Sequence, residues 1–313
     1  MLSPDAGIDD DNREVGRRSD DLTRLAIAAC AILGVTWQAS AASPEGMRLY
    51  IFTSQPLDIA KSALSSAATG DEKILIPVAF FLIKHPKGNI LFDTGDNDRI
   101  ITDQTYWGPM AAMLDKGVKA DLAIDTQLEK IGIKPTDINY VILGHMHLDH
   151  AGNVGKFPNA TIVVQRDEIA NAFWPPKDYA GPYISGDFEM LRASTGSGSA
   201  GRQPTIELNG DLDLFGDGSV YVHRAAGHTP GSQLAVVRLP KTGTVVLTSD
   251  TCYLQENLNK DILPSIGLTY SPTEMLNGYA YIKRVRDTEK GDVLMAHDAE
   301  GFKAHKHSPE YYE

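Results

Sequence analysis

The chain has 313 residues, which is enough for one large domain or two small ones. Its 29 Lys and Arg residues are outnumbered by 41 Asp and Glu residues, and no basic cluster is dense enough to follow a phosphate backbone. The resulting net charge of −12 argues against a nucleic-acid partner and is otherwise ordinary for a soluble globular protein.

An apolar run near the N-terminus, Leu25–Val35, follows Arg24 and precedes an Ala-Ser-Ala sequence at 39–41. Small residues at such positions are typical of a signal-peptidase site, and the run is too short for a permanent membrane span. We therefore predict a cleaved export signal, a mature N-terminus near Ala42 and a periplasmic or secreted location. Residues 1–42 form an N-terminal extension in this interpretation, and residues 43–313 form the folded domain.

The segment before this run departs from a typical export signal. It is long and rich in Asp and Glu, whereas such signals begin with a short basic stretch. Arg17-Arg18 is followed by Ser-Asp-Asp, where a twin-arginine signal requires apolar residues. A biological start at a later residue, for instance Leu22, would remove the discrepancy. Residues 27–30 (IAAC) also resemble a lipoprotein cleavage box, although the apolar run continues past the cysteine.

From about Met47 the sequence alternates strand-like and helix-like segments. The apolar segments Lys73–Lys84 and Asn89–Asp93 flank a Pro-Lys-Gly turn and predict a buried hairpin. The predicted mature domain keeps one cysteine, Cys252, so it cannot form an internal disulfide. We expect this thiol to be packed in the core, the alternative being an approach to the functional site.

Two helices and one long loop are predicted further along the chain. Apolar residues at helical spacing run through Ala120–Gly132 and stop before Pro135. The sequence Ser-Pro-Thr-Glu at 271–274 is a capping box that opens a helix reaching about Lys290. Residues 194–204 are small, polar and glycine-rich, so we expect a surface loop there rather than a domain boundary.

Three histidines and an aspartate lie within six residues at 145–150, directly after the apolar run 140–143. Two histidines two positions apart at a strand end can face one metal ion, while Asp149 and His150 can face a second. Imidazole nitrogen and carboxylate oxygen are the donors that zinc and similar divalent ions accept. A chance cluster on an exposed loop is a poor alternative, because the chain has only nine histidines.

Three later strand-like segments also end in a potential metal ligand. In layered α/β proteins functional sites gather at strand ends and in the loops that follow them. Each ligand taken alone would more often be structural, but the repeated pattern favours one shared site. The segments and their ligands are 219–224 with His228, 243–249 with Asp250, and 292–296 with His297.

The order of these residues resembles the metallo-β-lactamase superfamily over about residues 47–300. The resemblance implies an α/β fold, an αββα sandwich in a single domain, and two divalent metal ions per chain, with zinc the expected metal. It assigns His145, His147 and His228 to one ion, Asp149, His150 and His297 to the other, and Asp250 to a bridge between them. Asp93, in the Asp-Thr-Gly turn at 93–95, matches a position that supports the ligands rather than binding metal.

A pair of divalent ions implies hydrolysis. A water that bridges them loses a proton near neutral pH and becomes a hydroxide nucleophile, while the ions polarise a carbonyl and hold the leaving oxygen. Such chemistry suits an ester, lactone, thioester, amide or phosphoester, and the fold does not select among them.

Asp250 and Tyr253 narrow the substrate class by resemblance. True β-lactamases of the superfamily usually lack an aspartate at the bridging position, whereas glyoxalase II thioesterases and lactonases have it. The pair Asp250 and Tyr253 resembles the N-acyl homoserine lactone lactonases, the quorum-quenching branch, in which the tyrosine hydroxyl reaches the substrate carbonyl. Residues 76–78 (IPV) and 162–168 (IVVQRDE) are similar to the same branch.

We therefore expect a metal-dependent lactonase that opens small-molecule lactones, with Tyr253 and Asp149 acting in catalysis. A phenol beside the metals can donate a hydrogen bond to the oxygen that becomes negative in the tetrahedral intermediate. A core tyrosine at a strand end is the alternative for Tyr253. Other readings of the whole chain are an organophosphate-type esterase, a pyridoxolactonase-like enzyme, a thioesterase, or a non-catalytic or di-iron member. His147 argues against the di-iron class, in which an acidic residue is expected there.

An acyl chain requires an apolar trough, and two segments are rich enough in large apolar residues to supply one. The same residues could instead pack in the core or form a homodimer interface, and the sequence leaves these alternatives open. The candidates are Tyr106, Trp107, Met110 and Met113 in the first segment, and Phe173, Trp174, Tyr179 and Tyr183 in the second.

Overall fold

The computed structural model describes residues 43–192 and 203–313. The predicted export signal and most of the predicted loop at 194–204 lie outside the described residues. Within the described ranges, no helix has the length and apolar character needed to cross a membrane.

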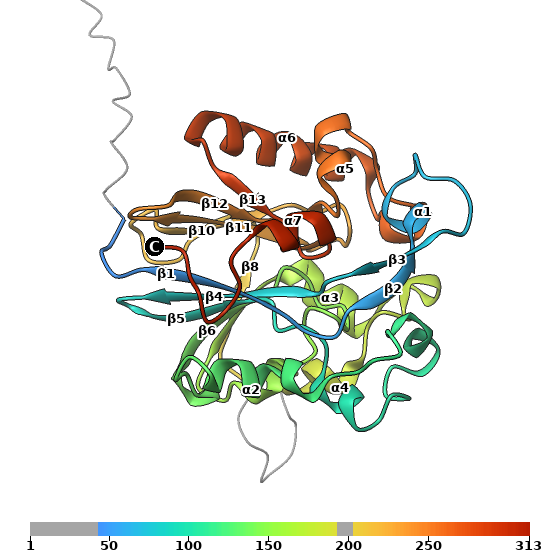
Figure 1. Ribbon diagram of the computed structural model, residues 1–313, viewed down its shortest axis with the longest axis horizontal. Coiled ribbons are helices and arrows are strands. Elements are labelled where there is room, and N and C mark those ends of the chain that lie inside the picture. Colours follow the sequence, from blue (N-terminus) through green and yellow to red (C-terminus); the bar gives the residue numbers. More distant parts are fainter. Residues whose placement is uncertain (1–42, 193–202) are drawn as a thin grey trace, which may run out of the picture. The chain divides into compact units, whose positions relative to one another are not determined.

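Two β-sheets stacked face to face form the centre of the fold (Figure 1). The first sheet has the strand order β1-β4-β5-β6-β7-β8, the second has the order β13-β12-β11-β10-β9, and β2 and β3 form a separate two-stranded sheet. The strands of the first sheet are β1 Arg48–Thr53, β4 Ala79–His85, β5 Gly88–Phe92, β6 Ile138–Ile142, β7 Thr161–Gln165 and β8 Thr205–Leu208. The remaining strands are β2 Leu57–Ala60, β3 Lys73–Ile76, β9 Leu212–Asp213, β10 Val220–Arg224, β11 Gln233–Leu239, β12 Gly243–Leu247 and β13 Asp292–Leu294.

Helices cover the outer faces of both sheets, with α6 on the second sheet and α2 and α4 on the first (Figure 1). The α-helices are α1 Lys61–Leu64, α2 Ile124–Glu129, α3 Arg166–Phe173, α4 Ser185–Phe188, α5 Gln255–Lys260, α6 Pro272–Glu289 and α7 Ala299–Ala304. The 3-10 helices are η1 Asp98–Ile101, η2 Gly108–Met113, η3 Ala120–Leu122, η4 Pro135–Asp137, η5 Val154–Lys156, η6 Lys177–Tyr179, η7 Glu189–Leu191, η8 Ser249–Thr251 and η9 Ile266–Leu268.

The alternation of side chains along β4 explains why the sheets are covered on both faces. Phe81 and Ile83 face the second sheet and pack against its strands. Phe80 and Leu82 point the other way and pack in the layer that contains α2 and α4. Since successive side chains of a strand point to opposite faces, an apolar residue at every position requires cover on both sides. Burial of each side chain of this size contributes about 2 kcal/mol to the free energy of folding. The two stacked sheets with helices on both outer faces confirm the predicted αββα sandwich in one domain.

The predicted continuous strand 73–84 is wrong in one respect. The chain forms two strands, β3 and β4, separated at Pro77 and Val78. Proline has no N–H for a ladder hydrogen bond, so β3 pairs with β2 while β4 pairs with β1 and β5 in the first sheet. The hairpin between β4 and β5 is confirmed.

The two helix predictions have different outcomes. The predicted helix start is confirmed, because the Ser271 hydroxyl accepts from the Glu274 N–H and α6 begins at Pro272. The reciprocal half of the capping box does not form, since the Ser271 N–H donates to the Gly227 carbonyl. The segment 120–132 is not one helix, since a 3-10 turn at its start is separated from α2 at Ala123. The Ile124 N–H there bonds to Asp98, a side chain from another part of the chain.

The strand directions bring the predicted ligands to one edge of the sandwich. β5 and β6 are parallel, as are β12 and β13. β10 and β12 are both antiparallel to β11, so they also run in the same direction. The loops that follow these strands therefore leave the two sheets at the same edge, the position at which α/β sheets place their sites.

Candidate metal centre

Seven side chains from four loops converge at this edge of the sandwich. Their donor atoms form three overlapping groups in which all atoms lie within 4.8 Å of one another. The groups are His145, His147 and His228; His145, His150 and Asp250; and Asp149, His150 and His297. The structure thus places every predicted ligand in one cluster.

The first half of the cluster contains three imidazoles and one carboxylate oxygen. His147 Nδ1 lies 3.0 Å from His228 Nε2. Asp250 Oδ2 lies 3.5 Å from His228 Nε2 and 3.8 Å from His145 Nε2. Three imidazoles and a carboxylate oxygen thus turn their lone-pair atoms toward one another.

The second half uses the other oxygen of the same carboxylate. Asp250 Oδ1 lies 3.1 Å from both His150 Nε2 and His297 Nε2, which are 3.3 Å apart. Asp149 Oδ2 is 3.7 Å from His150 Nε2 and 3.6 Å from His297 Nε2. Asp250 therefore points one oxygen at each half, which is the arrangement that a bridging ligand needs.

These atoms fit two divalent cations. Ligand atoms about 2.0 to 2.1 Å from a tetrahedral ion lie about 3.3 Å from one another, which is within the observed range of separations. His145 Nε2 is buried and has no hydrogen-bond partner, although buried polar atoms are normally paired. Burial lowers the pKa of His145, His147 and His228, and neighbouring histidines lower those of His145 and His147 further. These three imidazoles are therefore neutral, the form that binds metal.

Groups behind the cluster fix the orientation of its imidazoles. Three ring nitrogens that face away from it bond to oxygen atoms: His150 Nδ1 to Asp93 Oδ2 at 2.9 Å, His228 Nδ1 to the Leu268 carbonyl at 2.8 Å, and His297 Nδ1 to the Pro77 carbonyl at 2.8 Å. Such partners select the tautomer and hold the ring plane. Asp93 thus lies behind the ligands, where it supports His150.

Asp93 and Ser249 meet behind the cluster in backbone conformations that favour glycine. Their φ angles are 60° and 46°, and the Ser249 hydroxyl donates to Asp93 Oδ2 at 2.8 Å. Asp93 Oδ1 accepts from the Gly144 N–H at 2.6 Å. A Cβ on Gly144 would lie 2.2 Å from Ser249 Oγ, so only glycine allows this approach beside His145. Strained residues of this kind cluster at functional sites.

A buried carboxylate, Glu168, ties two of the ligand loops together. It accepts hydrogen bonds from the Met146 N–H at 2.8 Å, the Thr229 hydroxyl at 2.5 Å, the Tyr183 hydroxyl at 3.1 Å and the Gly231 N–H at 3.3 Å. Met146 lies between two ligands and Thr229 follows a third. From the sequence alone, Glu168 received no role of its own. Glu168 is the last residue of the stretch 162–168, and that stretch is the signal from which its importance could have been inferred.

Tyr253 lies at the cluster, whereas Cys252 does not. The Tyr253 hydroxyl donates to Asp250 Oδ2 at 2.8 Å and lies 3.0 Å from His228 Nδ1. Burial and the Asp250 charge raise the pKa of Tyr253 well above its usual range, so the phenol keeps its proton. The Cys252 thiol is fully buried and bonds to the Leu254 carbonyl at 3.6 Å, as expected for a packed side chain.

One cavity opens directly beside the cluster. It measures about 250 Å³ and is lined by His147 and His228 together with Tyr179, Tyr183 and Tyr270. Two of the eight predicted trough residues, Tyr179 and Tyr183, therefore line it. Tyr270 lies in neither of the two segments that were proposed for the trough from the sequence. Trp107 is buried in the core, and the Tyr106 hydroxyl donates to Asp187 at 2.7 Å. Those two aromatic side chains serve packing.

The αββα fold and this buried set of five imidazoles and two carboxylates define a metal-dependent hydrolase. The family model of the Metallo-beta-lactamase superfamily matches residues 75–281. The chain belongs to that superfamily, and within it to the group of the N-acyl homoserine lactonases, as three similarities show. These confirm the resemblance seen in the sequence.

Two curated relatives are N-acyl homoserine lactonases. The chain is 32% identical to N-acyl homoserine lactonase AttM of Azorhizobium caulinodans over 268 residues, which cover 85% of this chain and 99% of that one. It is 28% identical to N-acyl homoserine lactonase AiiA of Bacillus thuringiensis subsp. kurstaki, over 84% of this chain and 98% of that one. A solved N-acyl homoserine lactone hydrolase, with N-hexanoyl-L-homoserine bound at its catalytic metal center, has a TM-score of 0.72 and 25% identity. That match covers 85% of this chain and 98% of the other.

Proposed function

We propose that this protein hydrolyses the ester bond of N-acyl homoserine lactones and so quenches quorum-sensing signals. The observation that carries the proposal is the buried Tyr253 hydroxyl, 2.8 Å from the carboxylate shared by both halves of the metal centre. The relatives with this activity match nearly their whole length to this chain. Hydrolysis adds water to the ring carbonyl and breaks the ring C–O bond, leaving a carboxylate and an alcohol.

Tyr253 is the donor for the carbonyl oxygen. Its phenol stays protonated because burial and Asp250 raise its pKa. In this structure the hydroxyl donates to Asp250 Oδ2, and it can turn to a substrate oxygen when that carboxylate binds cations. The hydrogen bond strengthens as negative charge develops on the carbonyl oxygen, so it lowers the barrier rather than merely binding the substrate.

Asp149 is the group placed to handle the proton. Its side chain is 14% exposed, while those of His150 and Asp250 are 0% and 5% exposed, so substrate can reach it. Only its Oδ2 faces the two imidazoles of the second half. The other oxygen can hold the proton from the attacking water and deliver it to the alcohol oxygen that leaves when the ring opens.

His145, His147 and His228 would hold one cation, Asp149, His150 and His297 the other, and Asp250 both. Two bound cations supply an activated water and a Lewis acid for the carbonyl. We propose zinc, since five imidazole nitrogens and two carboxylates suit its preferences. Elemental analysis of protein produced without added metal tests this assignment, and a different predominant metal would contradict it.

A pH-stat assay with purified, metal-replete protein tests the reaction. The panel contains N-acyl homoserine lactones, a simple γ-lactone, a thioester, a phosphotriester and a β-lactam. We expect acid release with the acyl homoserine lactones to exceed that with every other member. A higher kcat/KM for the thioester or the phosphotriester would replace the proposal by the corresponding hydrolase.

We further propose that the protein is exported and cleaved near Ala42. The apolar run 25–35 and the small residues at 39–41 support this. N-terminal sequencing of natively produced protein is the test, and an intact chain in the cytoplasm would contradict export. The net charge of −12 supports the absence of a nucleic-acid partner. A homodimer stays a prediction, which the molecular mass in solution decides.

A further inference from the structure

We propose that the acyl chain of the substrate leaves the metal centre over His147 and His228 and passes between Tyr179 and Tyr270, so that these tyrosines determine the preference for long acyl chains. This inference rests on the proposed function, because it places part of that substrate. It follows from which cavity the metal ligands line and from the exposed apolar residues around the mouth of that cavity.

The chemistry of the substrate requires the acyl route to begin at the metal ligands. The amide that carries the acyl chain is bonded to the ring carbon next to the scissile carbonyl. A chain that starts there must enter a cavity lined by ligands of the centre. The 250 Å³ cavity beside His147 and His228 meets this requirement. Its other walls are largely apolar or aromatic, with Pro176, Pro182 and Tyr183 among them.

Large apolar side chains gather around the mouth of this cavity. Tyr179 and Tyr270 line it and are 42% and 57% exposed. Ile266, next to the lining residue Gly267, is 75% exposed, and Trp174 is 74% exposed. These four make up the majority of the seven exposed large apolar residues in the part of the chain that the structure describes. Such a cluster at one mouth marks a binding surface rather than scattered exposure.

The route continues outward along a shared wall. A second, open cavity of about 590 Å³ includes Trp174 and shares Asn171, Pro176, Pro230 and Tyr270 with the first. Its one basic lining residue, Arg224, is already bonded to Asp167 at 2.8 Å and to the Pro230 carbonyl at 3.0 Å. No unpaired basic side chain among these lining residues could therefore bind a negatively charged end of the acyl chain. An uncharged alkyl tail long enough to cross Tyr270 fits this route.

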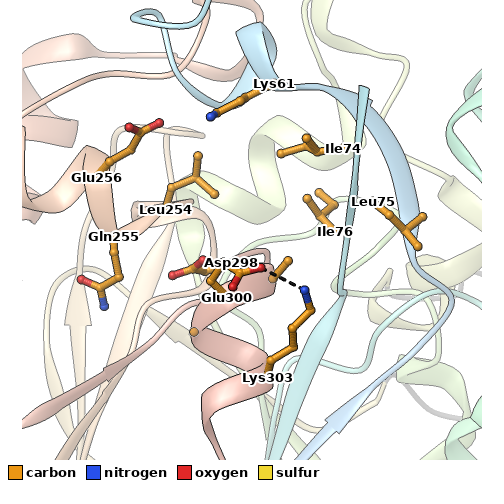
Figure 2. A pocket seen from close by; sticks show the side chains of 12 residues that line it. Lys61, Ile74, Leu75, Ile76, Leu254, Gln255, Glu256, Asp298, Glu300 and Lys303 are labelled. Carbon is orange, nitrogen blue, oxygen red and sulfur yellow. Dashed lines mark hydrogen bonds and ion pairs between the residues drawn. The ribbon is translucent and has the colours of Figure 1, made fainter. Parts of the chain in front are cut away.

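Another cavity, larger than the one beside the metal ligands, is the competing location, and its lining argues against it. Figure 2 shows this cavity of about 540 Å³, with Ile74, Ile76 and Leu254 among the side chains around it. None of the seven metal ligands lines it. The acyl route that begins at the metal ligands is therefore the 250 Å³ cavity.

The test compares N-butanoyl and N-dodecanoyl homoserine lactones as substrates of the metal-loaded protein. The variants are Tyr179→Ala, Tyr270→Ala and the double variant, and Leu75→Ala is the control. Leu75 is 52% exposed and lines the competing cavity. We expect the ratio of kcat/KM for dodecanoyl over butanoyl lactone to fall about 10-fold in the double variant, since an alkyl chain loses its apolar cover. The change should reside in KM, and the metal content should stay that of the parent.

Three results would overturn the inference. An equal loss for both lactones in the double variant would show a structural role for the tyrosines. A selective loss of dodecanoyl lactone turnover in Leu75→Ala would place the chain in the other cavity. An unchanged ratio, with weaker binding of the double variant to phosphatidylglycerol vesicles, would make the apolar mouth a membrane-docking surface. Failure of the proposed function looks different, because the unmodified protein would then open neither lactone.

Discussion

Two regions border the same cavity and are held together in different ways. The ligand loops, which carry the seven metal ligands, are fixed by buried polar groups: Glu168 bonds to backbone N–H groups of two loops, and Asp93 bonds to His150 and Gly144. The cavity wall, at residues 174–183 and 266–270, presents Trp174 and Tyr270, which are more than half exposed. The loops therefore determine the chemistry, and the wall determines which substrates reach it.

The physical difference lies in what a substitution costs. A buried donor that loses its partner costs about 1 to 3 kcal/mol, and more when charge is involved, because water cannot replace the bond. Truncation of an exposed aromatic side chain changes the free energy of unfolding little. Variation in the wall can thus change specificity without disturbing the fold, whereas the loops tolerate little change.

The largest expected effect is on the bridging carboxylate. Asp250→Asn should lower the metal content below two ions per chain and reduce kcat by more than about 100-fold, since even the partners of ligands cost 10-fold to 100-fold. Elemental analysis and a lactone-opening assay measure both. Asp121→Asn, an exposed aspartate, is the control. Full activity of the unmodified protein at one ion per chain would contradict a dinuclear centre.

Glu168→Ala tests whether the loops depend on a buried carboxylate. The change leaves two backbone N–H groups and two hydroxyls without their acceptor, so we expect the free energy of unfolding to fall by about 3 kcal/mol or more. Urea unfolding of the apoprotein measures this, and metal titration should show weaker binding. Glu129→Ala, an exposed residue of α2, should change stability by less than about 0.5 kcal/mol. Equal effects of the two variants would remove the distinction between loops and surface.

Tyr253→Phe separates catalysis from metal binding within the loops. The variant should keep two ions, because the phenol is not a ligand, and lose roughly 10-fold in kcat, because a donor that shares its role with a cation contributes less than a sole oxyanion donor. Tyr221→Phe is a matched control, since it deletes a similar hydroxyl-to-carboxylate bond, to Asp211 at 3.0 Å. Parent values of kcat and kcat/KM for Tyr253→Phe would leave the lactonase proposal without its main support.

A pH-dependent effect on stability concerns Asp187, which accepts from Asn97 and Tyr106 beside the first predicted trough segment. Burial raises the pKa of Asp187 to about 7, well above its unfolded value near 4. The folded state then holds a proton that the unfolded state has lost, so Asp187 lowers stability as pH rises from about 4 to 7, and the cost stays constant above 7.

Asp187→Asn should remove this dependence. The Asn oxygen can still accept both hydrogen bonds, and the amide carries no charge at any pH. We expect the variant to be more stable than the parent at pH 8 by up to about 3 kcal/mol, with a smaller difference at pH 4. Thermal unfolding between these pH values is the measurement. A difference that does not change with pH would mean that Asp187 stays ionised in the fold.

Much of the fold and of the metal cluster could be predicted because both are local patterns. The six residues at 145–150 contain four of the seven ligands, and each later ligand lies within four residues of the end of an apolar segment. The sequence Ser-Pro-Thr-Glu at 271–274 likewise specifies the start of α6, where Ser271 is the N-cap. The strand prediction across Pro77 failed because proline has no N–H for a ladder hydrogen bond, so β3 pairs with β2 and does not continue into β4.

The sequence by itself determined the donor chemistry and the strand ends that carry the ligands, because hydrophobic periodicity and ligand spacing act over a few residues. The αββα class was implied by the resemblance of the ligand order to a known superfamily. Only the tertiary structure decided that Glu168 joins two loops, that Asp250 divides its oxygens between two halves, and that Tyr270 rather than Trp107 borders the cavity. These contacts join residues up to about a hundred positions apart. Their geometry arises when the two sheets pack together, and no short pattern encodes it.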